Sequence, residues 1–240
     1  ALDESKNNYL MGVVAMDDLF GISVVDVTTG EYRLTEVDTL GKLLDEINKF
    51  MPSELICNES FYISGVDIED LKERLGISVS SLAPHYFDEE CCKKSLCRHF
   101  SVQTLDGLGL ADYSVGITAA GAVMEYLEET QKTSLAHILE LVPYKVGKYM
   151  LLDRNTRRNL ELVETLREKK KRGSLLWVLD RTRTAMGARK LRNTLEQPFI
   201  QKEEILKRFD AIDELNANMI TREELREYLN PIYDLERLLS

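Results

Sequence analysis

The order of apolar and polar residues near the start of the chain predicts strands before helices. Apolar runs at 9–16 and 21–27 and an alternating run at 31–37 predict three antiparallel strands joined by tight turns. The next apolar residues repeat at helical spacing, and Pro52 ends the helix that they predict; they are Leu40, Leu43, Leu44, Ile47 and Met51. A short buried strand at 55–57, a helix at 68–75 that ends at Gly76, and a fifth strand at 77–80 follow.

The resulting succession β-β-β-α-β-α-β predicts an α/β domain with a mixed sheet and flanking helices, in the order of a ribonuclease H-like fold. A further helix spans about 113–131. Small residues gather on one side of it, where they permit close packing on the sheet: Gly116, Ala119, Ala120 and Val123. Apolar residues between 135 and 143 then predict a partly packed linker.

The second half of the chain predicts an all-α arrangement after a short apolar strand at 149–152. Asp153 or Thr156 begins a helix that runs to about Arg172, and Gly173 ends it. Ser174 caps an apolar turn whose Leu176, Trp177 and Leu179 are predicted to be core, and a basic helix follows. Helices are then expected at 202–217 and from a capping box at 221–224 to the residue before Asn230. The last apolar stripe, Ile232, Leu235, Leu238 and Leu239, has to be buried against further structure, so we expect the chain to stop inside a domain.

Charge is distributed unevenly along the chain, whose net charge is −10. Residues 1–152 carry 12 basic and 25 acidic side chains, whereas residues 153–209 carry 16 basic and 8 acidic ones. A basic segment inside an acidic chain allows local phosphate contacts but not wholesale coating of DNA. No run of about 18 apolar residues predicts a membrane span, and no leader is recognisable, so we expect a cytoplasmic protein. The first residue, Ala1, suggests a piece of a longer protein.

Metal chemistry has two candidate residue sets in this sequence. Cys91, Cys92, Cys97 and His99 could ligate zinc, but they lack the paired spacing of structural zinc sites, so reduced and unpaired cysteines are the favoured interpretation. A nuclease of the ribonuclease H-like type needs carboxylates around two metal ions, and the candidates are Asp17, Asp18, Asp26 and Glu59. Asp17 and Asp18 are typical of a surface turn, and no acidic residue of the first strand faces Asp26.

One long, irregular stretch of sequence carries a family resemblance. It reads Asp153-Arg-Asn-Thr-Arg-Arg-Asn-Leu-Glu-Leu162, then Leu179-Asp-Arg-Thr-Arg-Thr-Ala-Met-Gly187, then Leu195-Glu-Gln-Pro198. This stretch closely resembles the start of the core (lever) domain of the MutS family of DNA mismatch-repair proteins. The residues before it resemble the connector domain of that family. The resemblance implies a ribonuclease H-like connector at 1–132, a linker at 133–148 and the first part of a helical core domain at 149–240.

The resemblance also implies a function for the whole protein that this chain does not carry alone. The whole protein would bind mismatched double-stranded DNA, use ATP and Mg²⁺ as a weak DNA-dependent ATPase, form a homodimer and recruit a MutL-type partner. The chain itself lacks the phosphate loop, because neither Gly41-Lys42 nor Gly147-Lys148 has the upstream glycine and following hydroxyl that such a loop needs. We therefore expect no catalytic residue, cofactor or metal in the chain, which would relay between the mismatch-binding, clamp and ATPase parts and offer a surface to MutL. The alternative is a stand-alone ribonuclease H-like, metal-dependent nuclease.

Basic side chains are the candidate site residues, either for phosphate or for salt bridges between domains. They are Arg157, Arg158, Lys169, Lys170, Lys171, Arg172, Arg181, Arg183, Arg189, Lys190 and Arg192. In the resembled family this region joins the connector, the levers and the ATPase module, so contacts between domains are favoured over DNA contacts.

Overall fold

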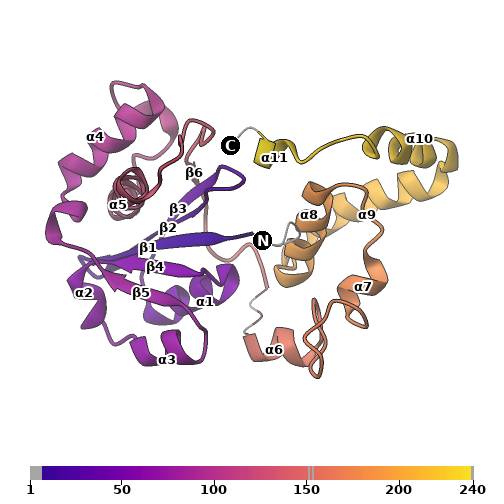
Figure 1. Ribbon diagram of the computed structural model, residues 1–240, viewed down its shortest axis with the longest axis horizontal. Helices are drawn as coiled ribbons and strands as arrows, with labels where there is room; N and C mark the ends of the chain where they lie inside the picture. The colour runs from indigo at the N-terminus through magenta and orange to yellow at the C-terminus, as the bar shows by residue number, and fades with distance from the viewer. Residues whose placement is uncertain (1–6, 151, 153, 239–240) are drawn as a thin grey trace. The chain divides into compact units, whose positions relative to one another are not determined.

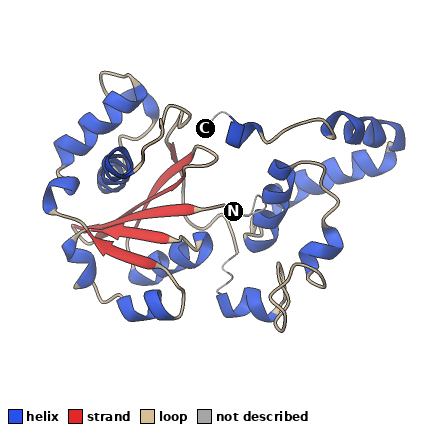
Figure 2. Ribbon diagram, in the orientation of Figure 1, coloured by secondary structure: helices blue, strands red, loops and turns tan. Residues whose placement is uncertain are grey.

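The computed structural model describes residues 7–150, 152 and 154–238. The chain divides between Val146 and Gly147 into two compact units. We call residues 8–146 the sheet unit and residues 147–238, together with Asn7, the helical unit (Figure 1). Every strand of the described residues belongs to the sheet unit (Figure 2). None of the described helices is both long and apolar enough to cross a membrane.

The sheet unit contains the mixed sheet that the sequence predicts, with one strand more than expected. The strands are β1 (Tyr9–Met16), β2 (Leu19–Asp26), β3 (Glu31–Val37), β4 (Glu54–Cys57), β5 (Ser78–Ser81) and β6 (Val142–Pro143), in the spatial order β5-β4-β1-β2-β3-β6. The first three strands are antiparallel, whereas β4, β5 and β6 pair in parallel with β1, β4 and β3. The sequence does not predict β6, because this two-residue strand is defined only by its pairing with β3.

Helices cover both faces of this sheet and bury a core on each (Figure 1). On one face lie α1 (Leu40–Phe50), α2 (Glu59–Tyr62) and α3 (Ile68–Glu73), whose Leu43, Ile47, Phe61 and Leu71 are buried. On the other face lie α4 (Glu89–Phe100) and α5 (Ser114–Thr130). Two short 3₁₀ turns, Pro84–Phe87 and Asp106–Leu108, join these elements. The positions predicted for the first, second and long helices agree with α1, α3 and α5.

Glycines bring α5 unusually close to the sheet, as its small residues predict. A Cβ added at Gly21 of β2 would lie 2.2 Å from the Val115 carbonyl oxygen of α5. A Cβ added at Gly12 of β1 would lie 2.5 Å from Val123 Cγ2. Glu36 of β3 fixes the start of the helix, because its Oε1 accepts hydrogen bonds from the amides of Val115 (2.8 Å) and Gly116 (3.0 Å). The carboxylate therefore satisfies two of the amides that a helix start leaves without partners.

The pattern of apolar residues does not predict α4, the helix that carries the candidate zinc ligands. Only three of its side chains are buried, namely Cys92, Ser95 and Leu96. Apolar residues therefore hardly repeat at helical spacing in this segment of the sequence. Its start nevertheless carries a strong signal, because Asp88 Oδ1 accepts a hydrogen bond from the Cys91 amide at 2.9 Å.

The helical unit contains six helices in its described residues. They are α6 (Arg154–Asn159), α7 (Leu175–Leu179), α8 (Ala185–Glu196), α9 (Lys202–Ala217), α10 (Met219–Leu229) and α11 (Leu235–Leu238). The prediction for α9 and for the end of α10 is confirmed. The predicted capping box at Thr221 is wrong, because the cap of α10 is Asn218, three residues earlier, and the helix begins at Met219. The Asn218 side chain accepts a hydrogen bond from the Thr221 amide at 3.1 Å.

The helix predicted from 153 or 156 to about Arg172 is wrong in its length, because more than half of the predicted residues lie beyond the end of α6. The helix α6 ends at Asn159, because Glu161 adopts the left-handed region with φ +47°. The amide of Leu162 donates to the Arg157 carbonyl (3.3 Å) and that of Glu161 to the Arg158 carbonyl (3.0 Å), which is the Schellman pattern of a helix end. Asp153, one of the two candidate first residues, lies outside the described residues.

A non-glycine residue in the left-handed region costs about 1–2 kcal/mol, so other contacts must hold Glu161 there. Its carbonyl oxygen accepts a hydrogen bond from the Leu175 amide (3.0 Å), and its carboxylate accepts one from the Leu166 amide (2.7 Å). Residues 160–174 consequently form a folded loop and not a continued helix. Gly173, with φ +94°, ends this loop, and Ser174 Oγ caps α7 at the Trp177 amide (3.3 Å), as predicted.

Candidate functional site

The eleven candidate cations all lie in the helical unit, but their surroundings divide them into three groups. Arg157 and Arg189 are buried, and Arg192 is half-buried. Lys170 and Lys171 are exposed and ion-paired. The remaining candidates are exposed: Arg158, Lys169, Arg172, Arg181, Arg183 and Lys190.

Arg157 lies on the inner side of α6 and is 9% exposed. Its Nε donates a hydrogen bond to the Leu152 carbonyl oxygen at 2.8 Å. The guanidinium therefore fixes the backbone at Leu152, which precedes α6, to this helix. A guanidinium used in this way does not present its donors to a phosphate at the surface.

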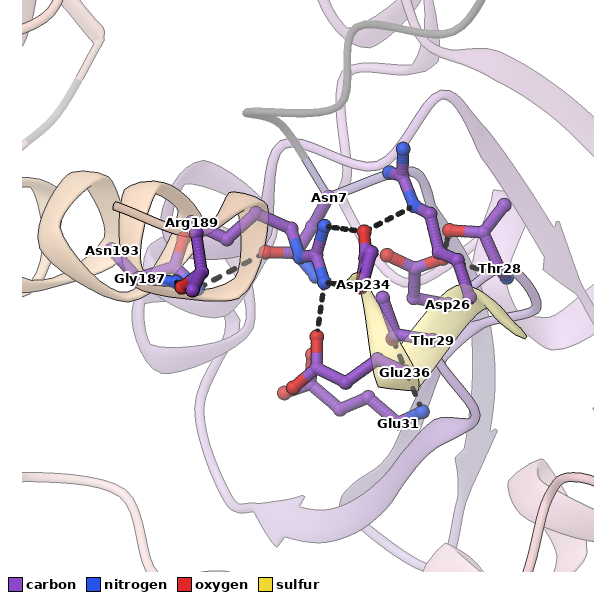
Figure 3. A network of polar contacts seen from close by, with 12 residues as sticks. Asn7, Asp26, Thr28, Thr29, Glu31, Gly187, Arg189, Asn193, Asp234 and Glu236 are labelled. Carbon is purple, nitrogen blue, oxygen red and sulfur yellow. Dashed lines mark hydrogen bonds and ion pairs between the residues drawn. The ribbon is translucent and has the colours of Figure 1, made fainter. Parts of the chain in front are cut away.

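The buried Arg189 is the centre of an ion cluster that reaches the surface at Glu236 (Figure 3). It is 3% exposed on α8, and Asp234 binds it with two hydrogen bonds, at 2.7 and 2.8 Å, while Glu236 binds Nη2. The hydrogen bonds of Asp234 raise the pKa of the Arg189 guanidinium, and those of Arg189 lower the pKa of the Asp234 carboxyl group. A bidentate pair of this geometry is strong and directional. The cluster ties α8 to the segment that begins α11.

An ion pair between Lys171 and Asp180 links the loop before α7 to the residue that follows this helix. The Lys171 ammonium pairs with Asp180, whose other oxygen accepts hydrogen bonds from the Thr182 amide (3.0 Å) and hydroxyl (2.6 Å). Burial acts to raise the pKa of Asp180, but the hydrogen bonds from Lys171 and Thr182 outweigh it and lower that pKa. Lys170 pairs with Glu168 at 3.2 Å on the exposed side of the same loop.

An exposed apolar surface lies between these cations, on α7. Leu176 is 1% exposed, as predicted, but Trp177 and Leu179 are 47% and 48% exposed, so their assignment to the core is wrong. A helix of five residues buries only one of its sides, and in α7 the buried side consists of Leu176. Together with Val178, at 56%, the exposed residues form what we call the α7 patch. Exposed cations flank this patch in the sequence on both sides, at 169–172 and at 181–183.

The fold separates the candidate carboxylates Asp17 and Asp18 from Asp26. Asp17 and Asp18, with φ of +51° and +60°, make the two-residue turn between β1 and β2. Asp26 lies at the opposite end of the eight-residue β2, about 24 Å from Leu19 at 3.4 Å per residue. It is buried and accepts hydrogen bonds from the Asn8 amide (3.1 Å) and from Thr28, as Figure 3 shows for the latter. Glu59 begins α2, which follows β4.

The candidate zinc ligands of α4 differ in their surroundings, since Cys92 is buried, Cys97 is half-buried and Cys91 is exposed. All four cysteines are free. The thiols of Cys57 and Cys92 are buried, and burial raises the pKa of each to about 12. The His99 ring bonds through Nε2 to the Ile138 carbonyl oxygen at 2.7 Å. Among the described residues there is no group of three or more His, Cys, Asp or Glu side chains arranged to hold a metal ion.

Comparison with known proteins gives two consecutive family matches. The model of MutS domain II matches residues 8–139, and the model of MutS domain III matches residues 155–240. The chain is 60% identical over 239 residues to the DNA mismatch repair protein MutS of Lachnoclostridium phytofermentans. It is 45% and 44% identical to the proteins of the same name from Ruminiclostridium cellulolyticum and Acetivibrio thermocellus. Each match covers the whole of this chain but only 26–28% of the relative. These matches do not support the stand-alone nuclease.

Proposed function

Because this chain belongs to the MutS family of DNA mismatch-repair proteins, we propose that it forms the connector and the first part of the core of a mismatch-recognition ATPase. The observation that carries the proposal is the pair of consecutive domain matches over nearly the whole chain. We assign 1–132 to the connector, 133–148 to the linker and 149–240 to the core. The division of the chain into two compact units supports two separate domains.

The connector has a ribonuclease H-like fold in this proposal. Three antiparallel strands are followed by parallel strands, with helices on both faces, and this arrangement supports the assignment. The fold would serve as a scaffold and not as a nuclease, because Asp17 and Asp18 lie at one end of β2 and Asp26 at the other.

The chain itself is expected neither to bind nor to hydrolyse ATP. Gly41-Lys42 lies in the first turn of α1, but Glu36 stands where the upstream glycine of a phosphate loop would be and Leu43 where its hydroxyl residue would be. Gly147-Lys148 likewise has Val142 upstream and Tyr149 after it. ATP and Mg²⁺ would act in the whole protein, which we take to be a cytoplasmic homodimer. Calorimetry of the chain with ATP and Mg²⁺ should show no heat of binding, and micromolar affinity would refute the assignment.

DNA binding by the chain is expected to be weak and blind to mismatches. The exposed cations of the helical unit, such as Arg158, Arg172 and Arg183, can meet phosphates, and phosphate contacts carry no sequence information. Affinity should fall steeply as salt rises. A fluorescence titration with matched and mismatched duplexes tests this, and a clear preference for the mismatch would contradict it.

The α7 patch and its flanking cations serve contacts between domains of the whole protein. An apolar surface that includes an exposed tryptophan and is flanked in the sequence by exposed cations suits an acidic, partly apolar protein surface better than it suits a duplex. Arg157 and Arg189 would instead serve the interior of the helical unit, since both are buried and bind Leu152 and Asp234 there. The chain would in this way relay between the mismatch-binding, clamp and ATPase parts.

The sheet unit would offer the docking surface for a MutL-type partner, within residues 9–131. Its acidic charge supports recognition of a complementary basic surface. Cross-linking of the whole protein to its MutL-type partner with ATP and mismatched DNA, followed by mapping of the linked peptides, tests this assignment. We expect links within 9–131 in excess of links to the helices after Thr156. Links confined to the ATPase module would refute the docking role.

A further inference from the structure

A single residue, Lys171, binds both ends of the helix α7. Its carbonyl oxygen accepts hydrogen bonds from the amide (3.0 Å) and the hydroxyl group (2.6 Å) of Ser174, which caps the start of the helix. Its ammonium group pairs with Asp180, which caps the end of the helix. A helix of five residues is too short to be stable by itself, so these contacts are needed to hold it.

Asp180 completes the connection from the other side. Its amide donates to the Leu176 carbonyl oxygen at 2.8 Å, and its carboxylate accepts the two hydrogen bonds from Thr182. The Asp180 side chain is only 10% exposed, so its pair with Lys171 is less screened by water than a pair between two exposed side chains. We call Lys171 and Asp180 the α7 bracket.

The α7 bracket fixes an apolar helix whose outer side faces solvent. Trp177, Val178 and Leu179 are exposed on it, and these three residues form the α7 patch. Side chains on a rigid element lose less conformational entropy on binding than side chains on a mobile one. Tryptophan and arginine are also enriched among the residues that contribute most to protein interfaces. The α7 patch therefore has the properties of a preorganised binding surface.

Arg181 adds a positioned charge at the end of α7. Its Nη1 donates a hydrogen bond to the Asp180 carbonyl oxygen at 3.0 Å and lies 3.5 Å from the Trp177 carbonyl oxygen. Within the part of the chain that the structure describes, its Nε and Nη2 groups have no partner. Two neighbouring guanidinium donors match the two oxygens of a carboxylate.

We propose that the α7 patch and Arg181 form a preformed anchor for a segment that presents a carboxylate beside an apolar side chain. Trp177 would contact the apolar side chain, Arg181 would bind the carboxylate, and Lys171 and Asp180 are positioning residues. The segment belongs to another part of the whole protein, so the inference rests on the contacts between domains proposed above and names their chemistry. Complementary charge around an apolar centre favours such a segment over a DNA backbone.

Time-resolved fluorescence anisotropy of the full chain tests the positioning role, because Trp177 is its single tryptophan. Asp180→Asn keeps an acceptor for Thr182 but loses the ion pair, and Lys171→Met loses the same pair from the other side. In each variant we expect the population with fast local motion of Trp177 to rise by about 5-fold or more. Lys171→Arg should behave like the wild type.

The matched control is Glu168→Gln, which removes the exposed pair between Lys170 and Glu168 in the same loop with the same change of charge as Asp180→Asn. It should leave the motion of Trp177 unchanged. The urea midpoint of the helical unit should be the same in all variants, since the change is confined to α7. Equal motion of Trp177 in Glu168→Gln and Asp180→Asn, or a tryptophan that is already mobile in the wild type, would overturn the preformed anchor.

Carbodiimide coupling in the whole protein tests the carboxylate. The reagent joins an amine to a carboxylate in direct contact with it, and Arg181→Lys introduces an amine at the site. Arg183→Lys is the matched control, because Arg183 is also exposed but makes no hydrogen bond to α7. Mass spectrometry should find more amide links from position 181 than from position 183 to Asp or Glu residues outside residues 1–240.

Hydrogen exchange of the α7 amides separates this inference from the function on which it rests. Slower exchange in the whole protein than in the chain alone is expected if another domain covers α7. Without that protection, both the contact between domains and the anchor are refuted. If α7 is protected but position 181 gives no excess of links, the carboxylate anchor is refuted and the contact between domains stands.

Discussion

Gly21→Ala should severely destabilise the sheet unit, because α5 passes directly over this position of β2. The added Cβ would lie 2.2 Å from the carbonyl oxygen of Val115, 2.4 Å from its carbonyl carbon and 2.9 Å from the amide nitrogen of Gly116. All three atoms belong to the backbone, so no side chain can rotate to make room. To restore an ordinary contact of 3.4 Å, the oxygen and the Cβ would have to separate by a further 1.2 Å.

The start of α5 is poorly able to make that movement. Glu36 holds its first amides at 2.8 and 3.0 Å, and Val115 and Ile117 are 4% and 5% exposed. Overpacking in a well-packed core costs about 1–3 kcal/mol, and more where the backbone has to shift. We expect a loss of roughly 3 kcal/mol or more in the free energy of unfolding of the sheet unit.

Urea denaturation followed by far-UV circular dichroism measures this loss, with Gly41→Ala as the control. Gly41 lies in α1 with no atom within 4 Å of an added Cβ, so alanine there should stabilise by about 0.5–1 kcal/mol. The single tryptophan, Trp177, lies in the helical unit and its fluorescence reports that unit separately. If Gly21→Ala lowers the stability by less than about 1 kcal/mol, the close approach of α5 does not constrain this position.

Three further predictions concern a helix cap, the thiols and the buried ion cluster. Glu36→Ala should cost about 1–2 kcal/mol through the loss of the cap on α5, and thermal denaturation beside Glu36→Gln, which keeps an acceptor, checks this. A thiol reagent at pH 8 should react slowly with Cys57 and Cys92, whose pKa burial raises to about 12, and rapidly with the other two thiols; four equally fast thiols would contradict the packing. Asp234→Asn should destabilise the helical unit by roughly 3 kcal/mol, because it leaves the buried Arg189 with a weaker partner. The folded-state pKa of Asp234 is lowered, so its contribution is present above the unfolded-state pKa and is lost as pH falls through the folded value; acid titration followed by Trp177 fluorescence should show this loss in the wild type and not in the variant.

Most elements of the sheet unit follow from the sequence because their patterns are local. The apolar runs of β1 to β3, the helical spacing of α1 and the small-residue side of α5 each lie within one element, and the sheet order agrees with them. The family resemblance of residues 153–198 also follows from the sequence alone, because it depends on residue types in a fixed order along the chain. Local order in the sequence was thus enough for the class of fold and for the family.

The missing elements depend on partners that are distant in the sequence. The strand β6 exists because Val142 pairs with Arg33, more than a hundred residues earlier. The helix α6 stops early because Glu161 is held in the left-handed region by an amide fourteen residues later, that of Leu175. The spacing of apolar residues within one helix or strand carries no information about either contact.

The same physical reason separates the candidate cations. The sequence identified a basic segment, but it could not distinguish Arg189 from its neighbour Lys190, which differs from it in burial and not in charge. Arg189 is buried because Asp234, 45 residues later, supplies two hydrogen bonds that compensate for its desolvation. Composition and spacing thus determined which residues carry charge, whereas the tertiary structure alone decided which of those charges face one another and which remain at the surface.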